Sequence, residues 1–162
     1  MEENSLAELQ KAISIIRSES VNGRGAQEQK WLQSHLEKPK LRSAVTQLSI
    51  VSLHILSGLQ EHELTGIELA EQLNVTRGGI TRAAKKLAEA GLIKISRKPD
   101  DKKKIYYSLT EDGAKIASVH DEMHRTLNKR MTQKIISKYS DSELKNATKL
   151  ISDLAEFERE FY

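Results

Sequence analysis

The sequence contains no cysteine, and this absence removes several kinds of chemistry at once. Disulfide scaffolds, thiolate zinc sites, iron–sulfur clusters and cysteine nucleophiles all need a thiol. Long apolar runs are also missing, since no stretch approaches the roughly 18 consecutive apolar residues of a membrane-spanning helix. The polar, acidic start from Met1 to Ser5 lacks the basic and apolar layout of a signal peptide. We therefore expect a cytoplasmic protein without a membrane partner.

Catalytic signatures are absent as well. The chain contains no G-x-G-x-x-G, G-x-x-x-x-G-K-S/T, G-x-S-x-G or H-E-x-x-H motif. Its 162 residues, of which 38% are apolar and 30% charged, fit one compact globular unit carrying extra helices. We therefore expect a folded protein that is not an enzyme.

Positive charge is concentrated in one part of the chain. Residues 76–104 hold ten Lys or Arg against three acids, a net charge of +7, so the other residues together carry −4 of the overall +3. A basic block on an otherwise acidic chain is typical of a surface that binds nucleic acid. A solvated charged face that binds nothing is the alternative.

Apolar residues recur at helical spacing on both sides of this block. The pattern predicts a helix through Leu6–Ile16, a short helical segment around Trp31–Leu36 and a helix over 41–57. After the block we expect two long helices, the first capped near Thr110 and the second beginning at Ser140. The last helix carries an apolar stripe that we expect to face inward, made of Leu144, Ala147, Leu150, Ile151, Leu154, Phe157 and Phe161.

The middle of the chain has the layout of a helix-turn-helix followed by a hairpin. A helix over 65–73 and a helix over 76–90 are separated by only two residues, which is the spacing of a tight turn. Two alternating segments, 92–97 and 104–109, flank a lysine-rich turn and predict a β-hairpin. The predicted fold is mainly α with a small β-hairpin wing, that is, a winged helix-turn-helix.

The second of these helices has one face suited to the major groove of DNA. With Ile80, Ala84 and Leu87 facing the core, the opposite face carries polar and basic side chains that can contact bases and phosphates. We expect Gly78 and Gly79 to let the helix N-terminus approach DNA closely; the alternative is that they only loosen the first turn. With the basic wing tip in the minor groove, the expected DNA-binding residues are Thr76, Arg77, Gly78, Gly79, Thr81, Arg82, Lys85, Lys86, Arg97, Lys102 and Lys103.

In their order, these motifs resemble the MarR family of winged-helix regulators. The matching pieces are Glu68-Leu69-Ala70 with Leu73-Asn74-Val75, Ile80-Thr81-Arg82 with Leu87, Gly91-Leu92-Ile93, Asp101-Lys102-Lys103 and Leu109-Thr110-Glu111-Asp112-Gly113. The resemblance extends from about Leu41 to Leu127. The family's wing carries Asp-x-Arg, whose arginine reaches the minor groove, and here Lys103 stands in that place.

The resemblance implies a homodimer that binds double-stranded DNA. Residues 1–40 and 111–162 would form a helical dimerisation region, and residues 41–110 the winged helix-turn-helix DNA-binding domain. A twofold axis favours a pseudo-palindromic operator with half-sites about one helical turn apart. The implied function is transcriptional regulation, usually repression, with DNA binding changed by a small effector in the cleft between the dimer helices and the DNA-binding domain.

A histidine pair suggests one kind of effector. His120 and His124 are four residues apart, which places both imidazoles on one helix face in a spacing that can chelate a metal. Some zinc sensors of the family carry such a pair at this point of the fold. Glu28, His35 and His54 are candidates for further ligands, although the sequence cannot bring them together. The alternative is that His120 lines the apolar stripe and His124 is solvated.

Two other hypotheses stay open. A small organic effector would occupy an apolar pocket formed by Trp31, Leu36, His120, Met123 and His124. The second hypothesis is a winged helix used only for protein contacts, but such a module would not need a basic block with a net charge of +7. Steep salt dependence of DNA binding would argue against it.

Overall fold

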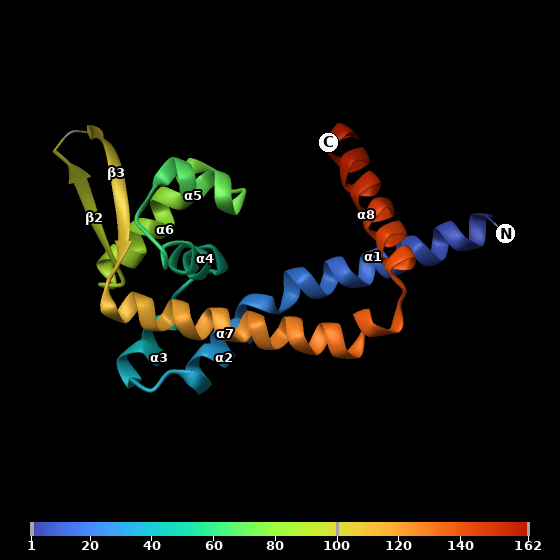
Figure 1. The fold of residues 1–162 in the computed structure, drawn as a ribbon, viewed down its shortest axis with the longest axis horizontal. Helices are drawn as coiled ribbons and strands as arrows, with labels where there is room; N and C mark the ends of the chain where they lie inside the picture. The colour runs from blue at the N-terminus through green and yellow to red at the C-terminus, as the bar shows by residue number, and fades with distance from the viewer. Residues whose placement is uncertain (1, 100, 162) are drawn as a thin grey trace. The chain divides into compact units, whose positions relative to one another are not determined.

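A computed structural model describes residues 2–99 and 101–161, and the fold is mainly helical with a small antiparallel sheet, as predicted (Figure 1). The elements in chain order are α1 (Glu2–Asn22), α2 (Arg24–His35), α3 (Pro39–Val45), α4 (Ile50–Gly58), β1 (Leu64–Thr65), α5 (Gly66–Leu73), α6 (Arg77–Glu89), β2 (Ile93–Lys98), β3 (Asp101–Leu109), α7 (Glu111–Lys134), the 3₁₀ turn η1 (Ile136–Lys138) and α8 (Asp141–Phe161). The chain divides into two compact units, Met1–Met123 and His124–Tyr162. Among the described residues, no helix is long and apolar enough to cross a membrane.

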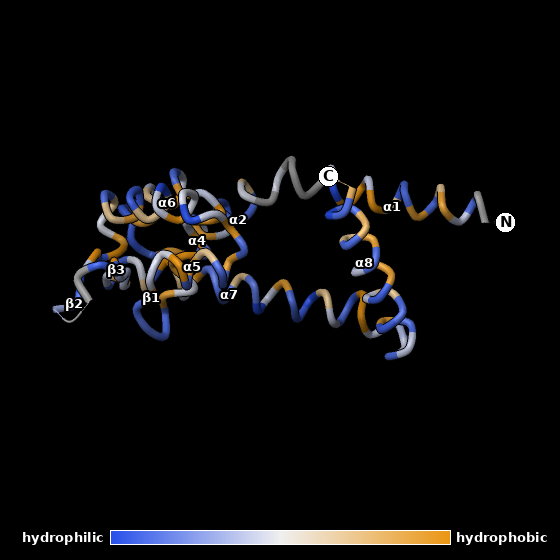
Figure 2. Tube along the Cα trace, turned by 90° about the horizontal axis from the view of Figure 1, so that it is seen from above, coloured by the Kyte–Doolittle hydropathy of each residue, from blue (hydrophilic) through white to orange (hydrophobic). Residues whose placement is uncertain are grey.

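The core of the first unit lies where α4, α5 and α6 meet. Figure 2 shows hydrophobic stretches of α4 and α5 lying together. Fully burying each such side chain contributes about 1.5–3 kcal/mol relative to leaving it exposed. The side chains exposed by no more than 1% include Leu53, Ile55, Leu56, Leu69, Ile80, Leu87, Leu92 and Ile116.

Local hydrogen bonds fix the ends of the two helices of the helix-turn-helix. Thr65 and Glu68 form a reciprocal capping box at the start of α5, and Asn74 ends that helix in the left-handed conformation with φ 51°. The hydroxyl of Thr76 accepts a hydrogen bond from the N–H of Gly79 at 3.1 Å, so Thr76 is the predicted N-cap of α6. Gly91, with φ 69°, follows its end.

The hairpin has a longer second strand and a shorter turn than the sequence predicted. β1, β3 and β2 form a three-stranded antiparallel sheet in that order. Lys98 pairs with Asp101, so the turn of six residues expected at 98–103 is wrong, and the connection contains only two residues. Strand β1 was not predicted, because two residues are too few to show alternation.

The helix expected over 41–57 is also wrong, because two helices occupy this segment. α3 ends at Val45, and Ser49 caps α4 by accepting a hydrogen bond from the N–H of Ser52 at 3.1 Å. The side chain of Gln29 donates to the carbonyl of Leu48 at 2.8 Å within this break. Val45 and Leu48 are both buried, so the apolar period continues through a segment that is not helical.

The second unit leaves its apolar stripe uncovered. Ser140 begins α8 as predicted, since its hydroxyl accepts a hydrogen bond from the N–H of Glu143. No described side chain of α8 is buried, and Phe157 and Phe161 are 58% and 72% exposed. The expectation that this stripe faces inward is therefore wrong for the single chain. The unit consists of the end of α7, η1 and α8, so it has no second layer to cover the stripe.

Candidate DNA-binding surface and metal centre

The predicted reading residues of α6 lie on one exposed face. Ile80, Ala84 and Leu87 point into the core and are almost fully buried. The hydroxyl of Thr81 donates to the carbonyl of Arg77 at 3.0 Å, one turn back along the helix. The exposed residues of the opposite face are Arg77, Gly78, Thr81, Arg82, Lys85 and Lys86, and the cap Thr76 is exposed beside them.

The two glycines of α6 have different surroundings. A Cβ atom on Gly78 would meet no atom within 4 Å, so Gly78 faces open space. A Cβ atom on Gly79 would lie 3.2 Å from the hydroxyl oxygen of Thr76, the N-cap of the helix. Gly79 therefore lies against the cap, whereas Gly78 faces open space where an external surface can approach the backbone.

The wing contributes further basic residues beside the reading helix. Arg97 and Lys103 are exposed, and Lys103 lines a hollow of about 240 Å³ that also includes Arg77 and Thr81. This hollow joins the wing to the exposed face of α6. Lys102 belongs to β3, but its side chain lies outside the described part of the structure.

One wing lysine is held by an acid that the sequence analysis did not single out. The ammonium of Lys98 lies 2.6 Å from the carboxylate of Glu63 and 4.3 Å from the ring centroid of Tyr106. The hydrogen bond to Glu63 raises the pKa of Lys98. Because Glu63 offsets the charge of Lys98, the basic wing has less uncompensated charge than a count along the chain indicates.

Four polar side chains from three helices converge on one point. Glu28 from α2, His54 from α4, and His120 and His124 from α7 each offer one ligand atom, and these atoms all lie within 4.8 Å of one another. Nε2 of His120 lies 3.4 Å from a carboxylate oxygen of Glu28. His120 is 1% exposed, so it is not a solvated surface histidine.

The chemistry of this cluster fits a zinc ion. Protein zinc sites use imidazole nitrogens and carboxylate oxygens at about 2.0–2.2 Å, mostly in a tetrahedron. Those bond lengths place neighbouring ligand atoms roughly 3.4 Å apart, and His120 and Glu28 already have this separation. Since the ligand atoms lie at most 4.8 Å apart, no pair has to approach by more than about 1.4 Å, which is within the reach of side-chain rotation.

The structure separates the remaining candidate ligand from this cluster. Nδ1 of His35 lies 2.9 Å from the carbonyl of Trp31, and the two rings are stacked with centroids 4.0 Å apart. His35 is therefore not part of the group that Glu28 and His54 form with the predicted histidine pair. Sequence spacing indicated the pair on α7, but only the fold brings the other two residues to it.

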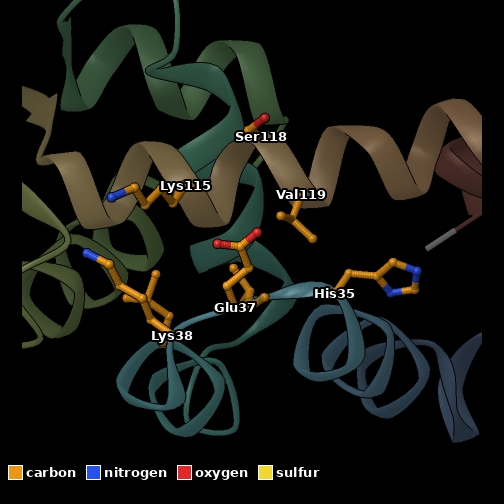
Figure 3. Close-up of a pocket in the computed structure, with 8 residues that line it drawn as sticks. His35, Glu37, Lys38, Lys115, Ser118 and Val119 are labelled. Carbon is orange, nitrogen blue, oxygen red and sulfur yellow. The ribbon is translucent and has the colours of Figure 1, made fainter.

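The residues expected to form an organic effector pocket have different surroundings in the structure. Of the five, Leu36 lines a hollow of about 280 Å³ between the end of α2, α3 and α7, together with His35, Glu37, Lys38, Leu41, Lys115, Ser118 and Val119. Figure 3 shows the carboxylate of Glu37 pointing toward α7. Met123 is buried in the interior, while His120 and His124 belong to the cluster described above.

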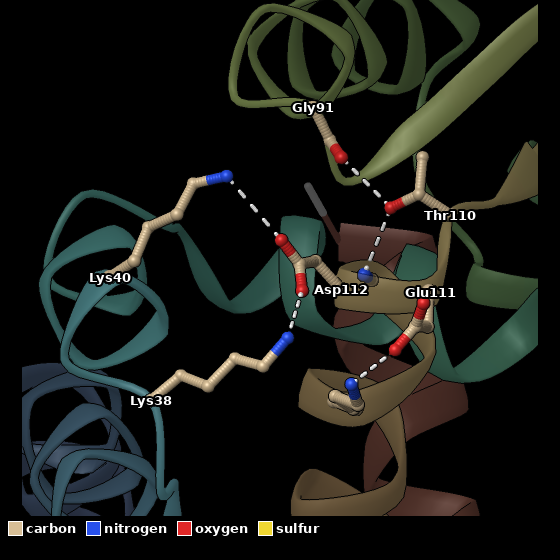
Figure 4. Close-up of polar contacts among 8 residues, drawn as sticks. Lys38, Lys40, Gly91, Thr110, Glu111 and Asp112 are labelled. Atoms are coloured by element: carbon tan, nitrogen blue, oxygen red, sulfur yellow. Dashed lines mark hydrogen bonds and ion pairs between the residues drawn. The ribbon is translucent and has the colours of Figure 1, made fainter.

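The start of α7 is tied to the end of α6. The hydroxyl of Thr110 donates to the carbonyl of Gly91 at 2.8 Å and accepts from the N–H of Gly113 at 3.1 Å (Figure 4). Asp112 lies 3.4 Å from the ammonium groups of both Lys38 and Lys40. Desolvation raises the pKa of Asp112, but these two cations outweigh it and hold the pKa below its ordinary value.

Comparison with known proteins identifies relatives of this chain. The sequence pattern of the MarR family matches residues 45–105. The transcriptional regulator ZitR of Lactococcus lactis subsp. cremoris (strain MG1363) is 36% identical over 104 residues, which are 64% of this chain and 70% of that protein. The transcriptional regulator AdcR of Streptococcus pyogenes serotype M6 is 33% identical over 104 residues, or 64% and 69% of the two chains.

Solved structures agree with the sequence matches. The crystal structure of Lactococcus lactis ZitR, described as a zinc-responsive MarR family member, has a TM-score of 0.67 at 26% identity and covers 100% of both chains. A ZitR mutant in complex with DNA has a TM-score of 0.60 at 33% identity, covering 72% of this chain and 77% of that one. The chain therefore belongs to the MarR family and is a DNA-binding transcriptional regulator, not an enzyme.

Proposed function

We propose that the protein is a zinc-responsive regulator that acts in the cytoplasm and, as a homodimer, represses transcription from a pseudo-palindromic operator. The observation that carries the zinc assignment is the convergence of Glu28, His54, His120 and His124. Three imidazoles and one carboxylate are a donor set that proteins use for zinc. The related ZitR is described as zinc-responsive, which supports the assignment.

In this proposal α6 enters the major groove and the wing enters the adjacent minor groove. Arg82 is the candidate for bidentate pairing with guanine, because its guanidinium is on the exposed face opposite Leu87. Lys85 and Lys86 supply charge to phosphates, as do the wing residues. The proposed DNA-binding residues are those expected from the sequence: Thr76, Arg77, Gly78, Gly79, Thr81, Arg82, Lys85, Lys86, Arg97, Lys102 and Lys103.

The exposed apolar faces of the terminal helices support the homodimer. Ile15 and Ile16 of α1 are 50% and 62% exposed, and α8 exposes Ile151, Phe157 and Phe161 by more than half. Contiguous exposed apolar residues mark interaction surfaces. We assign residues 1–40 and 111–162 to the dimerisation region and residues 41–110 to DNA binding.

The ligand residues connect the candidate metal centre to the DNA-binding elements. His54 is on α4, which packs against α6, and His120 is on α7, whose first turn contacts the end of α6. A bound zinc ion supplies two positive charges and fixed ligand bonds to helices α2, α4 and α7. Glu28, His54, His120 and His124 hold those helices in one arrangement, and α6 is positioned by two of them.

The experiment selects bound sequences from random duplex DNA with the purified protein, with and without zinc, and then measures affinity for the recovered site. His54→Ala is compared with His35→Ala, a histidine outside the cluster. Trp31, the only tryptophan, lies one turn from Glu28 and reports zinc binding by fluorescence. We expect zinc to change operator affinity in the wild type and in His35→Ala, and His54→Ala to lose the response. Zinc that changes neither fluorescence nor operator affinity would contradict the proposal.

The other hypotheses predict different outcomes. An organic effector would use the hollow lined by Leu36, and its binding would not depend on His54. A module for protein contacts alone would recover no sequence motif and would show little salt dependence. A regulator that neutralises several phosphates instead loses affinity steeply as the salt concentration rises.

A further inference from the structure

The two ring nitrogens of the buried His120 have different neighbours. Nδ1 lies 2.8 Å from the hydroxyl oxygen of Ser57, while Nε2 lies 3.4 Å from a carboxylate oxygen of Glu28. Nε2 therefore faces the candidate metal centre and Nδ1 faces α4. A neutral imidazole has one N–H and one bare nitrogen, and a metal binds only the bare one.

The contact of Nδ1 with Ser57 is 0.6 Å shorter than the contact of Nε2 with Glu28, which favours the tautomer that leaves Nε2 bare. The hydroxyl of Ser57 is close enough to accept a hydrogen bond from Nδ1–H. A carboxylate oxygen of Asp121 lies 3.8 Å from the same nitrogen and adds negative charge on this side of the ring. The side-chain amide of Gln60 donates to Asp121 and so holds that carboxylate in place.

We propose that Ser57 is a positioning residue for the metal ligand His120, which it holds with the proton on Nδ1 and the lone pair of Nε2 directed at the metal. This inference rests on the zinc assignment above. Ser57 and His54 are one turn apart on α4, so one short helix supplies both a ligand and the partner that orients a second ligand. Substituting a residue in this role typically weakens metal affinity about 10–100-fold.

Ser57 also links two of the helices that the metal would join. It belongs to α4, which packs against the reading helix α6, whereas His120 belongs to α7. The contact uses Nδ1 and leaves Nε2 to the metal, so it can orient His120 without competing for the ligand atom. A preset ligand loses less side-chain freedom on binding, which strengthens binding.

The test compares Ser57→Ala, Ser57→Thr and the control Ser34→Ala. Ser34 is a close match because its hydroxyl lies 2.9 Å from Nδ1 of His35, outside the cluster. Zinc affinity is measured by competition with a chromophoric chelator. We expect Ser57→Ala to bind zinc about 10–100-fold more weakly, Ser57→Thr to recover most of the loss, and Ser34→Ala to match the wild type.

A second measurement separates positioning from a purely structural role. Long-range ¹⁵N–¹H correlation spectra of the metal-free wild type report which nitrogen of His120 carries the proton, and we expect Nδ1. In Ser57→Ala we expect a mixture of tautomers. Wild-type His120 protonated on Nε2 would overturn the inference, as would unchanged zinc affinity in Ser57→Ala. A wild type that binds no zinc but shows the Nδ1–H tautomer would instead overturn the zinc assignment, and with it the role of Ser57 in metal binding.

Discussion

Gly113, in the first turn of α7, lies directly against the main chain of Leu92 just beyond the reading helix. A Cβ atom at position 113 would be 1.9 Å from the carbonyl oxygen of Leu92. That oxygen also accepts a hydrogen bond from the N–H of Thr110 at 3.1 Å. The helix that carries His120 therefore meets the end of α6 through backbone contact, with no room for a side chain.

Replacing Gly113 with alanine should destabilise the protein. Alanine is the better helix former by about 1 kcal/mol, but the added methyl group forces the start of α7 away from Leu92. Overpacking of this kind costs about 1–3 kcal/mol or more. Urea unfolding measures the net effect. A variant as stable as the wild type would show that the start of α7 can move away from Leu92 without loss of stability.

Gly78 and Gly79 should respond differently to the same substitution. Gly78→Ala meets open space, so we expect unchanged or slightly raised stability, by up to about 1 kcal/mol, together with weaker operator binding if DNA approaches the backbone there. Gly79→Ala crowds the cap oxygen of Thr76 and should lower the melting temperature. Thermal unfolding and fluorescence anisotropy check the two effects. Wild-type operator affinity in Gly78→Ala would remove the close-approach hypothesis.

The helix-turn-helix could be predicted because its signals are local. Thr76, the stripe of Ile80, Ala84 and Leu87, and Gly91 define the start, the buried face and the end of α6 within one segment. The break between α3 and α4 could not be predicted in this way. It depends on the cap formed by Ser49, and the apolar spacing on either side continues without interruption.

The candidate site shows the same division between local and long-range signals. The spacing of His120 and His124 is local, so the sequence indicated a chelating pair. Glu28 and His54 reach that pair only through the packing of α2 and α4 against α7, which no short segment encodes. The partner of Lys98 was missed for the same reason, since Glu63 is distant in the chain.

Glu63→Gln should strengthen DNA binding. The change removes the acid that holds Lys98, which leaves the ammonium available to a phosphate. We expect higher affinity at low salt. The slope of log affinity against log salt concentration should steepen by about one unit, because one more counterion is released on binding. Glu61→Gln, an exposed neighbour in the same loop, changes the net charge equally and serves as the control. Equal effects of the two variants would mean that only overall charge matters.

Stability should fall in acid partly through Glu68. Hydrogen bonds from the backbone N–H and then the hydroxyl of Thr65 lower the pKa of Glu68 below its ordinary value of 4.5. The unfolded chain then binds more protons than the folded one, so this contribution is present above pH 4.5 and is lost as the pH falls through the lower, folded-state pKa. Glu68→Gln should have a flatter dependence of unfolding free energy on pH in that range. If the unfolding free energy of Glu68→Gln depends on pH as steeply as that of the wild type, Glu68 does not contribute to the loss of stability in acid.

The exposed end of α8 should determine the oligomeric state. Phe157 and Phe161 have ring centroids 5.2 Å apart and are both mostly exposed in the single chain. Burying two such rings between copies would contribute several kcal/mol, at about 1.5–3 kcal/mol each. Phe157→Asp places a charge in that surface, so we expect monomers in analytical ultracentrifugation and loss of tight binding to a two-half-site operator. Glu156→Gln, one residue away, should remain dimeric. A dimeric Phe157→Asp variant would show that α8 does not form the interface, and the exposed face of α1 would then be the next to test.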